Sequence, residues 1–223
     1  MNINTTIEHT LLKPQATQED IEVLCREAME NSFAGVCVSP VYVQKCVEIL
    51  KDSDVRCVSV VGFSSGAFLT ETKVEEARRI VELGANEVDM VMAIWALKNR
   101  DNNKVIEDIK MVRKAILKQN PQSALKVIIE TALLSDDEKK IACELCLKAG
   151  ADFVKTSTGA FEGASVEDVN LIKSCVGDQA QIKASGGIRN FEFAQKLIKA
   201  GAVRLGTSAG IEISAGKDST TSY

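Results

Sequence analysis

The stretch that decides the fold is Asp152-Phe153-Val154-Lys155-Thr156-Ser157-Thr158-Gly159, a short apolar run that ends in a lysine, small hydroxyl residues and a glycine. Ala149-Gly150-Ala151 before it is typical of the end of a helix, and Ser165 after it is typical of a helix start. Lys155 therefore ends a strand that lies between two helices. In parallel α/β folds this end carries active sites, because the loops after the strands surround a common mouth. A lysine is costly to bury without a purpose, and the alternative is a strand-end lysine that extends its amine into solvent.

The same alternation of short β-rich runs and helices with capping residues continues along the chain. Motifs around Gly84, Gly150 and Gly201 each end a helix and lead into a strand. Helix starts are indicated by Thr17 with Asp20, Ser39-Pro40, Ser135 with Glu138, Ser165 with Asp168, and Asn190. The expected strands are 5–9, 35–38, 55–61, 87–91, 125–130, 152–156, 181–184 and 204–206.

Eight strands separated by helices in 223 residues indicate an α/β fold, a single-domain (β/α)8 TIM barrel. An open doubly wound sheet has less support, because no G-x-G-x-x-G follows the first strand. We expect one catalytic barrel domain over residues 1–216. Residues 217–223 form a polar segment, which predicts a flexible C-terminal tail.

Composition and charge favour small-molecule partners. The formal net charge is -4, so no basic field attracts nucleic acid or an anionic membrane, although a local anion site is compatible with this charge. The N-terminus has no signal pattern, and the longest apolar runs, such as 90–97, are too short to span a bilayer. The expected location is cytoplasmic.

The cysteines and the single histidine argue against a metal centre. The seven cysteines are scattered through expected strands and helices, which indicates reduced thiols and not a disulfide framework. Cys143 and Cys146 form a C-x-x-C inside a helical run, so helix packing is favoured over a zinc or redox site. His9 is the only histidine. We therefore expect chemistry without a metal or an organic cofactor.

Alternation along the strands places ionisable side chains on the lumen face of the barrel, namely Asp89, Glu130, Lys155 and Lys183. The apolar residues that then face the helices are Val88, Met90, Val127, Ile129, Val154 and Ile182. Branched apolar residues usually fill the lumen, so charges near the strand ends indicate a catalytic layer. An internal salt-bridge network is the structural alternative.

Two lysines and a carboxylate in one dry cavity have a specific chemical meaning. Desolvation and a like charge both favour an uncharged amine, so we expect Lys155 and Lys183 to lower each other's pKa. A neutral lysine attacks a carbonyl group and forms an iminium, which accepts electrons while a neighbouring carbon–carbon bond breaks or forms. Asp89 is expected to transfer protons through water.

Two glycine-containing loops follow the seventh and eighth expected strands, at 183–189 and 204–210. Loops in this position commonly bind phosphate in barrels. Their glycines let the backbone approach an anion, Thr207 and Ser208 supply hydroxyl groups, and a short helix after Gly206 would direct its N-terminus at the site. A tight-turn role for the glycines is the alternative.

Six segments carry a resemblance that runs nearly end to end. They are IEHTLL (7–12), GVCV (35–38), EVDMV (87–91), KVIIET (126–131), DFVKTSTG (152–159) and KASGGIR (183–189). With them the chain resembles deoxyribose-phosphate aldolase, a family of class I, Schiff-base-forming aldolases. The resemblance implies that Lys155 is the Schiff-base lysine, that Lys183 tunes it and that Asp89 is a proton-relay acid. It also implies a phosphate cup of Gly186, Gly187, Thr207 and Ser208, and a substrate pocket that includes Cys37, Thr158 and Gly159.

The implied reaction is the reversible cleavage of 2-deoxy-D-ribose 5-phosphate to acetaldehyde and D-glyceraldehyde 3-phosphate, without a metal or an organic cofactor. The implied partners are small phosphorylated sugars and aldehydes. We expect a homodimer, although no residue pattern sets the oligomeric state. The chain departs from the family pattern at Glu8, Ser64 and Ala209, where an aspartate, a proline and a serine are usual. These departures bear on rate and phosphate affinity more than on reaction type.

The last residue, Tyr223, has two interpretations. Composition alone indicates a solvated terminus. The resemblance implies a phenol that folds over the barrel mouth and assists proton transfer at the enamine carbon.

Three rival functions share parts of this pattern. The first is another Schiff-base barrel aldolase of the transaldolase or keto-acid kind, which shares Lys155. The second is a catalytically silent phosphate-binding barrel, in which the lysines bind anions. The third is a metal-dependent aldolase, which the single histidine disfavours.

Overall fold

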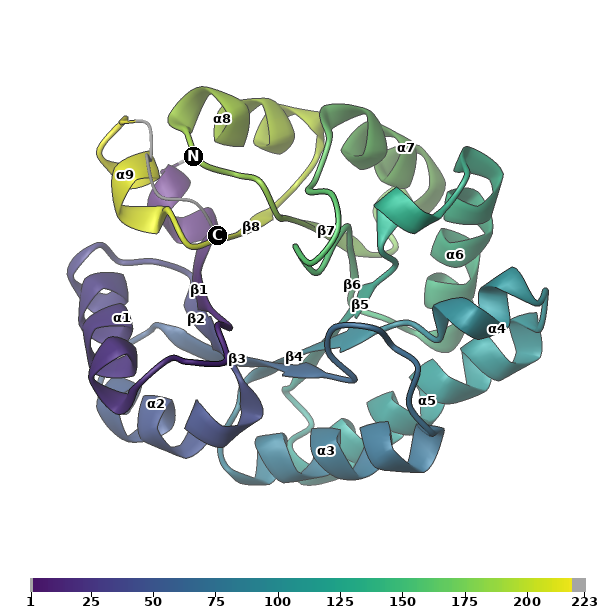
Figure 1. Ribbon diagram of the computed structural model, residues 1–223, viewed down its shortest axis with the longest axis horizontal. Coiled ribbons are helices and arrows are strands. Elements are labelled where there is room, and N and C mark those ends of the chain that lie inside the picture. Colours follow the sequence, from purple (N-terminus) through teal and green to yellow (C-terminus); the bar gives the residue numbers. More distant parts are fainter. Residues whose placement is uncertain (1, 218–223) are drawn as a thin grey trace.

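The chain forms a closed barrel of parallel strands in the order β1-β2-β3-β4-β5-β6-β7-β8. The computed structural model describes residues 2–217. Each strand pairs in parallel with the next, and β8 pairs with β1. In the view of Figure 1 the strands enclose the centre and the helices form an outer ring. The expected (β/α)8 barrel is confirmed, whereas the expected tail after Lys217, with Tyr223, lies outside the described residues.

All eight expected strands are present. They are β1 (Ile7–Leu11), β2 (Gly35–Val38), β3 (Arg56–Val61), β4 (Glu87–Val91), β5 (Ala124–Ile128), β6 (Phe153–Lys155), β7 (Gln181–Ser185) and β8 (Arg204–Thr207). The first strand starts later than expected, because Ile3–Thr6 form a 3-10 helix, η1, which the Asn2 side chain caps. The fifth ends earlier than expected, because Glu130 adopts the left-handed conformation with a φ of 55°.

The helices alternate with the strands. The α-helices are α1 (Gln18–Glu30), α2 (Val43–Leu50), α3 (Thr70–Glu82), α4 (Ile94–Lys98), α5 (Asn102–Gln119), α6 (Asp136–Ala149), α7 (Val166–Val176), α8 (Phe191–Ala200) and α9 (Gly210–Ser214). Two short 3-10 helices, η2 (Pro40–Tyr42) and η3 (Thr131–Leu133), precede α2 and α6. Ser39 precedes Pro40 as expected, but it makes no side-chain cap bond.

The expected capping residues open four of these helices. Thr17 and Ser135 begin α1 and α6 with complete capping boxes, in which the cap hydroxyl and the carboxylate three residues later each bond the other's backbone N–H. Ser165 and Asn190 cap α7 and α8 with their side chains. Gly150 ends α6 in the left-handed conformation, with a φ of 83°. These signals direct the chain into β6 and β7 and so place their lysines.

Apolar side chains fill the space between the barrel and the helix ring. Those expected on the outer face of the strands are each at most 1% exposed: Val88, Met90, Val127, Ile129, Val154 and Ile182. They belong to the same core cluster as Ile80 of α3 and Ile109 of α5. The alternation of the strands therefore separates an apolar outer layer from the lumen.

The helix ring contains a buried ion pair that sequence patterns did not indicate. Lys73 of α3 donates to Asp108 of α5 at 2.7 Å, and also to the carbonyl oxygen of Val91 at the end of β4 at 3.0 Å. The Thr70 hydroxyl donates to the same carboxylate at 2.8 Å. Lys73 and Asp108 are buried, so the pair joins two helices to the end of β4.

The N-terminal ends of the strands surround a cavity of about 430 Å³. Its lining includes Arg56, Glu87, Phe153 and Arg204. The Phe153 ring is almost fully buried, with Lys126 Nζ 5.6 Å and Arg204 Cζ 6.0 Å from its centroid. This aromatic ring and its two cations therefore lie at the end of the lumen opposite the C-terminal mouth.

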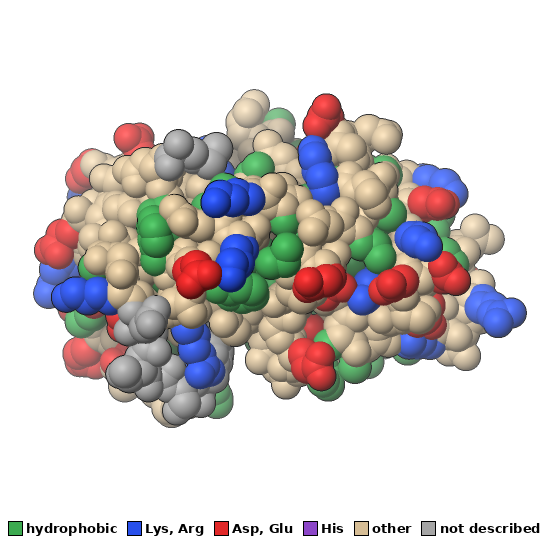
Figure 2. Space-filling model, turned by 90° about the horizontal axis from the view of Figure 1, so that it is seen from above, with side chains coloured by type: hydrophobic (Ala, Val, Ile, Leu, Met, Phe, Trp, Pro, Cys, Tyr) green, Lys and Arg blue, Asp and Glu red, His purple; other side chains and the backbone are tan. Residues whose placement is uncertain are grey.

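The cysteines and the surface bear on the remaining expectations. All seven cysteines are free thiols, and Cys143 and Cys146 are buried in α6, as expected for helix packing. Among residues 2–217 no helix has the length and apolar character needed to cross a membrane. Acidic and basic side chains lie intermixed on the face shown in Figure 2.

Candidate active site

Lys155 is the last residue of β6 and is only 3% exposed. It lies in register with Ile128 of β5 and Lys183 of β7. The backbone N–H of Thr156 donates to the carbonyl oxygen of Lys183, which extends the pairing beyond the end of β6. The β-rich run before Lys155 thus delivers a lysine to the C-terminal end of the barrel.

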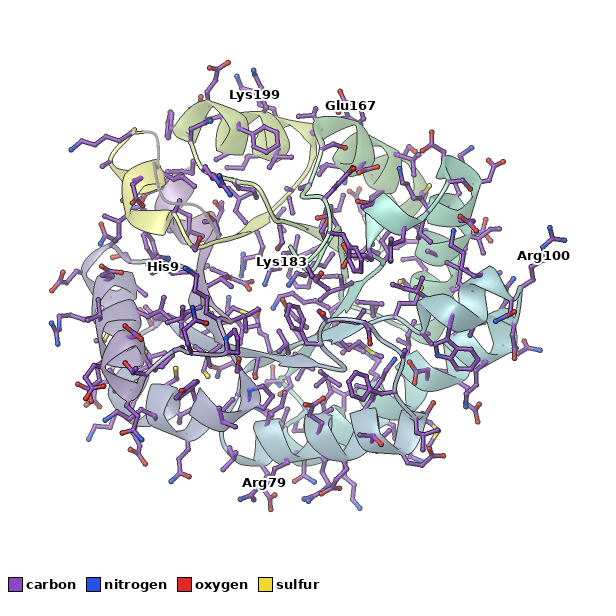
Figure 3. All side chains as sticks on the ribbon, viewed as in Figure 1. His9, Arg79, Arg100, Glu167, Lys183 and Lys199 are labelled. Carbon is purple, nitrogen blue, oxygen red and sulfur yellow. The ribbon has the colours of Figure 1, made fainter. Side chains whose placement is uncertain are left out.

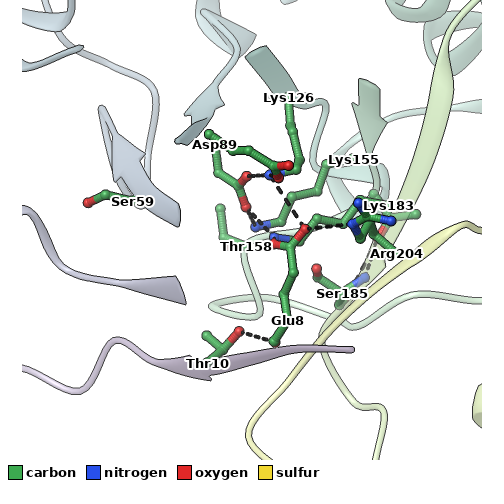
Figure 4. Close-up of polar contacts among 12 residues, drawn as sticks. Glu8, Thr10, Ser59, Asp89, Lys126, Lys155, Thr158, Lys183, Ser185 and Arg204 are labelled. Atoms are coloured by element: carbon green, nitrogen blue, oxygen red, sulfur yellow. Dashed lines mark hydrogen bonds and ion pairs between the residues drawn. The ribbon is translucent and has the colours of Figure 1, made fainter. Parts of the chain in front are cut away.

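Asp89 of β4 brings three lysines together in the lumen. Its Oδ2 accepts from Lys155 Nζ and from Lys183 Nζ, both at 2.6 Å, and its Oδ1 accepts from Lys126 Nζ at 3.1 Å. Asp89, Lys126 and Lys183 are fully buried. Figure 3 shows Lys183 within the barrel, and Figure 4 shows these contacts at close range.

Two further carboxylates extend this cluster towards the N-terminal end of the barrel. Glu8 Oε2 accepts from Lys183, and Glu8 Oε1 lies 3.5 Å from Lys126 Nζ. Glu87 Oε2 lies 2.5 Å from the same Lys126 ammonium. Arg204 Nε lies 3.6 Å from Glu8 Oε1. The lumen therefore holds a continuous chain of opposite charges, which we call the lumen ion cluster.

Sequence reasoning missed Lys126, Glu87 and Glu8 as members of this cluster. The alternation that selects Asp89 also selects Glu87, and the alternation along β5 that selects Glu130 also selects Lys126. These two residues were therefore detectable. Glu8 stood out only as a departure from the family pattern, and its partner Lys183 is 175 positions away in the chain.

The environment of Lys155 favours its uncharged form. Burial lowers the pKa of Lys155, the like charge of Lys183 lowers it further, and the contact with Asp89 opposes both only in part. Burial also disfavours the charged form of Asp89, but Lys126, Lys155 and Lys183 together hold the Asp89 pKa well below its usual value. The pair therefore combines an ionised carboxylate with an amine that loses its proton more readily than a lysine in water.

The pKa of Lys183 does not follow the expectation that the two lysines lower each other's pKa. Burial acts to lower the pKa of Lys183, but Asp89 and Glu8 outweigh it and raise the pKa above its usual value. The prediction was wrong for Lys183, because it took no account of Glu8. Lys183 thus stays charged, while Lys155 does not have a second carboxylate to hold its proton.

The alternative of an internal salt-bridge network is present in the same residues. Within residues 2–217, Lys126 and Lys183 each contact more than one carboxylate, whereas Lys155 contacts Asp89 alone. Lys155 is also the lysine at the mouth end of its strand. The network therefore holds two charged lysines and leaves the third poorly compensated.

Alternation along β5 predicted that Glu130 lies in the lumen with Asp89, but Glu130 does not join the lumen ion cluster. Its left-handed backbone turns the carboxylate to Thr158, whose backbone N–H and hydroxyl donate to Glu130 Oε2 at 3.1 and 2.5 Å. Thr158 and Gly159 belong to the loop that follows Lys155. Cys37 of β2 is buried, and burial raises the pKa of its thiol to about 11.

The expected phosphate loops follow β7 and β8. Gly186 and Gly187 have φ values of 85° and 72°, which a residue with a side chain rarely adopts. The Thr207 hydroxyl donates to the carbonyl oxygen of Ile188 at 2.6 Å, so it ties the two loops together and its proton is engaged. Ser208 is exposed, and the short helix expected after Gly206 is α9. Phosphate binding by these residues stays a prediction.

Comparison with known proteins matches nearly the whole chain to one family of aldolases. A family model described as DeoC/LacD family aldolase matches residues 4–216. The deoxyribose-phosphate aldolase of Carboxydothermus hydrogenoformans is 54% identical over 218 residues, which are 97% of this chain and 96% of that protein. The deoxyribose-phosphate aldolase of Natranaerobius thermophilus is 53% identical over 214 residues, which are 95% of this chain and 96% of that protein.

Solved structures show the same barrel. A structure described as QR15, an aldolase, superposes with a TM-score of 0.90 at 39% identity, and covers 96% of this chain and 95% of its own. The deoxyribose phosphate aldolase of Aeropyrum pernix, described as having a unique tetrameric structure, gives a TM-score of 0.89 at 32% identity, with 96% and 89% covered.

Proposed function

This chain belongs to the DeoC/LacD family of aldolases and is a carbon–carbon lyase, and we propose that it reversibly cleaves 2-deoxy-D-ribose 5-phosphate to acetaldehyde and D-glyceraldehyde 3-phosphate. Its relatives at 54% and 53% identity bear the name of that aldolase. The observation that carries the proposal is Lys155, a buried amine with a lowered pKa beside an ionised carboxylate.

Lys155 supplies the nucleophile in this scheme. Its uncharged Nζ attacks the C1 aldehyde carbon of the open-chain sugar, and the resulting carbinolamine takes up a proton and loses water to give an iminium. The iminium draws in the electrons of the C2–C3 bond while the C3 hydroxyl loses its proton, so D-glyceraldehyde 3-phosphate leaves and an enamine remains. Protonation of C2 and addition of water then release acetaldehyde and restore the amine.

Asp89 and Lys183 set the proton affinity of Lys155. Asp89 accepts from Lys155 Nζ at 2.6 Å, so it is placed to exchange protons at that atom. Lys183 shares the same oxygen and supplies the like charge that helps to lower the pKa of Lys155. The scheme uses no metal ion and no organic cofactor.

The two glycine loops supply the anion site in this proposal. The backbones of Gly186 and Gly187, together with Thr207 and Ser208, form the phosphate cup. The anion is bound by backbone donors and the Ser208 hydroxyl more than by a dedicated cation, while the Thr207 hydroxyl, which donates to Ile188, holds the two loops together. Cys37, Thr158 and Gly159 line the pocket around the reacting carbons. We further propose a cytoplasmic location, a role in deoxyribonucleotide catabolism and a homodimeric assembly.

One assay tests the reaction. Deoxyribose 5-phosphate is supplied with a chelator present, and glyceraldehyde 3-phosphate is detected by a coupled enzyme. Activity that survives the chelator supports the proposal, whereas activity lost on chelation supports the metal-dependent alternative.

Borohydride reduction in the presence of acetaldehyde separates the remaining alternatives. An iminium former gains a stable mass adduct on Lys155, and a silent phosphate-binding barrel gains none. A transaldolase-like enzyme forms the adduct with a different donor, so donor selectivity decides between the two aldolases.

A further inference from the structure

Glu130 is a buried carboxylate near Lys155, the proposed Schiff-base lysine. The proposed scheme gives Glu130 no role. Glu130 follows β5, next to the strand that carries Lys155. The backbone N–H of Ile129 donates to the carbonyl oxygen of Lys155, and that of Thr131 donates to Thr156, both at 3.0 Å. Glu130 thus lies between two residues whose backbone N–H groups bond to Lys155 and to Thr156, the residue after it.

The position of Glu130 costs free energy in two ways. Its φ of 55° is the left-handed conformation, which is unfavourable for a residue with a side chain. Its side chain is fully buried, and its Oε1 atom has no hydrogen-bond partner among the described residues. A glycine at this position would relieve the backbone and an apolar residue would relieve the burial. Stability alone therefore does not explain a glutamate here.

The carboxylate determines how the Thr158 hydroxyl group is used. A hydroxyl has one donor and two acceptor positions. Thr158 Oγ1 donates to Glu130 Oε2 at 2.5 Å and accepts from the backbone N–H of Ala160 at 3.1 Å. One acceptor position remains. In the loop that follows Lys155, Thr158 can therefore accept another hydrogen bond but cannot donate one.

The Thr158 hydroxyl remains an acceptor that cannot donate to another group, whatever the protonation state of Glu130. Burial raises the pKa of Glu130, while the two bonds from Thr158 and the charge of Lys155 act in the opposite direction and are weaker. Both Thr158 donors point to Oε2. A proton taken up by the carboxyl group therefore goes to Oε1, which has no partner, and Thr158 keeps its acceptor position.

We propose that Glu130 is a positioning residue for substrate specificity, which holds the Thr158 oxygen as a hydrogen-bond acceptor for a hydroxyl group of the phosphorylated aldehyde. This inference rests on the proposed function. The acetaldehyde half of the substrate has no hydroxyl group, and an ionised phosphate has no donor. Of the two aldehydes that the reaction joins, only D-glyceraldehyde 3-phosphate has a hydroxyl group, at C2. In the sugar this group is the C4 hydroxyl, whereas the C3 hydroxyl is the one that loses its proton in the proposed scheme.

The test compares two aldehydes in the addition of acetaldehyde. One is D-glyceraldehyde 3-phosphate and the other is 3-oxopropyl phosphate, which lacks the C2 hydroxyl. The measured quantity is the ratio of kcat/KM for the hydroxylated aldehyde to that for the deoxy aldehyde. It is determined for the full chain and for Glu130→Leu, Glu130→Gln, Thr158→Val and the double variant Glu130→Leu/Thr158→Val.

We expect the ratio to fall about tenfold in Glu130→Leu and in Thr158→Val, the size of one buried hydrogen bond. The double variant should show no further loss, because both changes remove the same contact. Glu130→Gln should stay within about twofold of the wild type, because its amide oxygen still accepts from Thr158. Equal loss on both aldehydes, or additive loss in the double variant, overturns the proposal.

Two controls keep the result interpretable. If Glu130→Leu does not fold, Thr158→Val alone decides, and an unchanged ratio in that variant rejects the inference. Borohydride trapping of the wild type with acetaldehyde reports on Lys155 alone. Absence of trapping means that the proposed function has failed, whereas trapping with an unchanged ratio means that only the role of Glu130 has failed.

Discussion

Lys155 and Lys183 donate to the same oxygen atom, Oδ2 of Asp89, at 2.6 Å each, and yet their pKa values move in opposite directions. Lys183 has a second carboxylate, Glu8, and remains charged. Lys155 has only the shared one, so burial dominates. This asymmetry supports the proposal that Lys155 is the nucleophile and that Lys183 acts through its charge.

Replacement of Lys155 should abolish the covalent step. We expect Lys155→Ala to reduce kcat by about 10⁴-fold or more and to remove the borohydride adduct with acetaldehyde. Mass spectrometry of the trapped protein checks this. An adduct found on a peptide that contains Lys183 reverses the assignment of the two lysines.

Replacement of Lys183 should raise the pKa of Lys155. Lys183→Leu removes a like charge and leaves Glu8 without one of its cations, so the ammonium form of Lys155 gains stability. The rate of trapping against pH should therefore move to higher pH, with slow trapping retained in alkali. The loss of stability should be about 3–5 kcal/mol, as for one partner of a buried ion pair.

A matched control for this variant lies outside the lumen. Lys73→Met removes another buried lysine that pairs with a carboxylate, and so it reproduces the loss of stability. It should leave the pH dependence of trapping in place. A shift of similar size in both variants means that the effect comes from general loosening of the barrel and not from charge.

The lumen ion cluster should make the fold sensitive to acid. The pKa values of Asp89 and Glu8 are lower in the folded protein than their usual values, so both groups bind protons more readily after unfolding. Their contribution to stability is fully present above the unfolded values of about 4, and it is lost as pH falls towards the folded values.

Urea unfolding between pH 7 and pH 3 measures this effect. The free energy of unfolding should decrease below about pH 5, and the decrease should be less steep in Glu8→Gln. A free energy that is constant over this range contradicts the lowered pKa values.

The loop after β8 should recognise the phosphate group. Ser208→Asp places a negative charge in the proposed cup, so KM for deoxyribose 5-phosphate should rise by about tenfold or more, while deoxyribose itself is little affected. Steady-state kinetics with both sugars give the comparison. Equal loss on the two means that this loop does not contact the phosphate.

The C-terminal tyrosine should act on the enamine and not on Schiff-base formation. Deletion of Tyr223, or Tyr223→Phe, should slow deuterium exchange from heavy water into the methyl group of acetaldehyde. Borohydride trapping on Lys155 serves as the control and should persist. An unchanged exchange rate returns Tyr223 to the interpretation of a solvated terminus.

Local signals were sufficient to predict the barrel. Capping residues such as Thr17 and Ser135, and helix-ending glycines such as Gly150, mark the element boundaries independently of tertiary contacts. The expected end of the fifth strand was wrong, because tertiary contacts set the backbone conformation there. The left-handed conformation of Glu130 ends β5 early, and no propensity favours that conformation in a glutamate.

The sequence predicted three members of the lumen ion cluster, but it did not predict the remaining members or the electrostatics of the cluster. Alternation brought Asp89, Lys155 and Lys183 to one face, because a strand period is a local property. The sign of the Lys183 shift depends on Glu8, which approaches from the opposite end of the sequence. Such a contact exists only after the barrel closes, so no local pattern encodes it.

The contact between Glu8 of β1 and Lys183 of β7 has a consequence for synthesis of the chain on the ribosome. Lys183 cannot be enclosed until its strand pairs with β8 and β8 pairs with β1. A nascent chain that has emerged only as far as β6 would have to bury Lys126 and Lys155 beside Asp89 without the completed ring. Burying these charges before all their partners are in place is costly, so the charged centre favours folding of the barrel after translation over stepwise growth of a half-barrel.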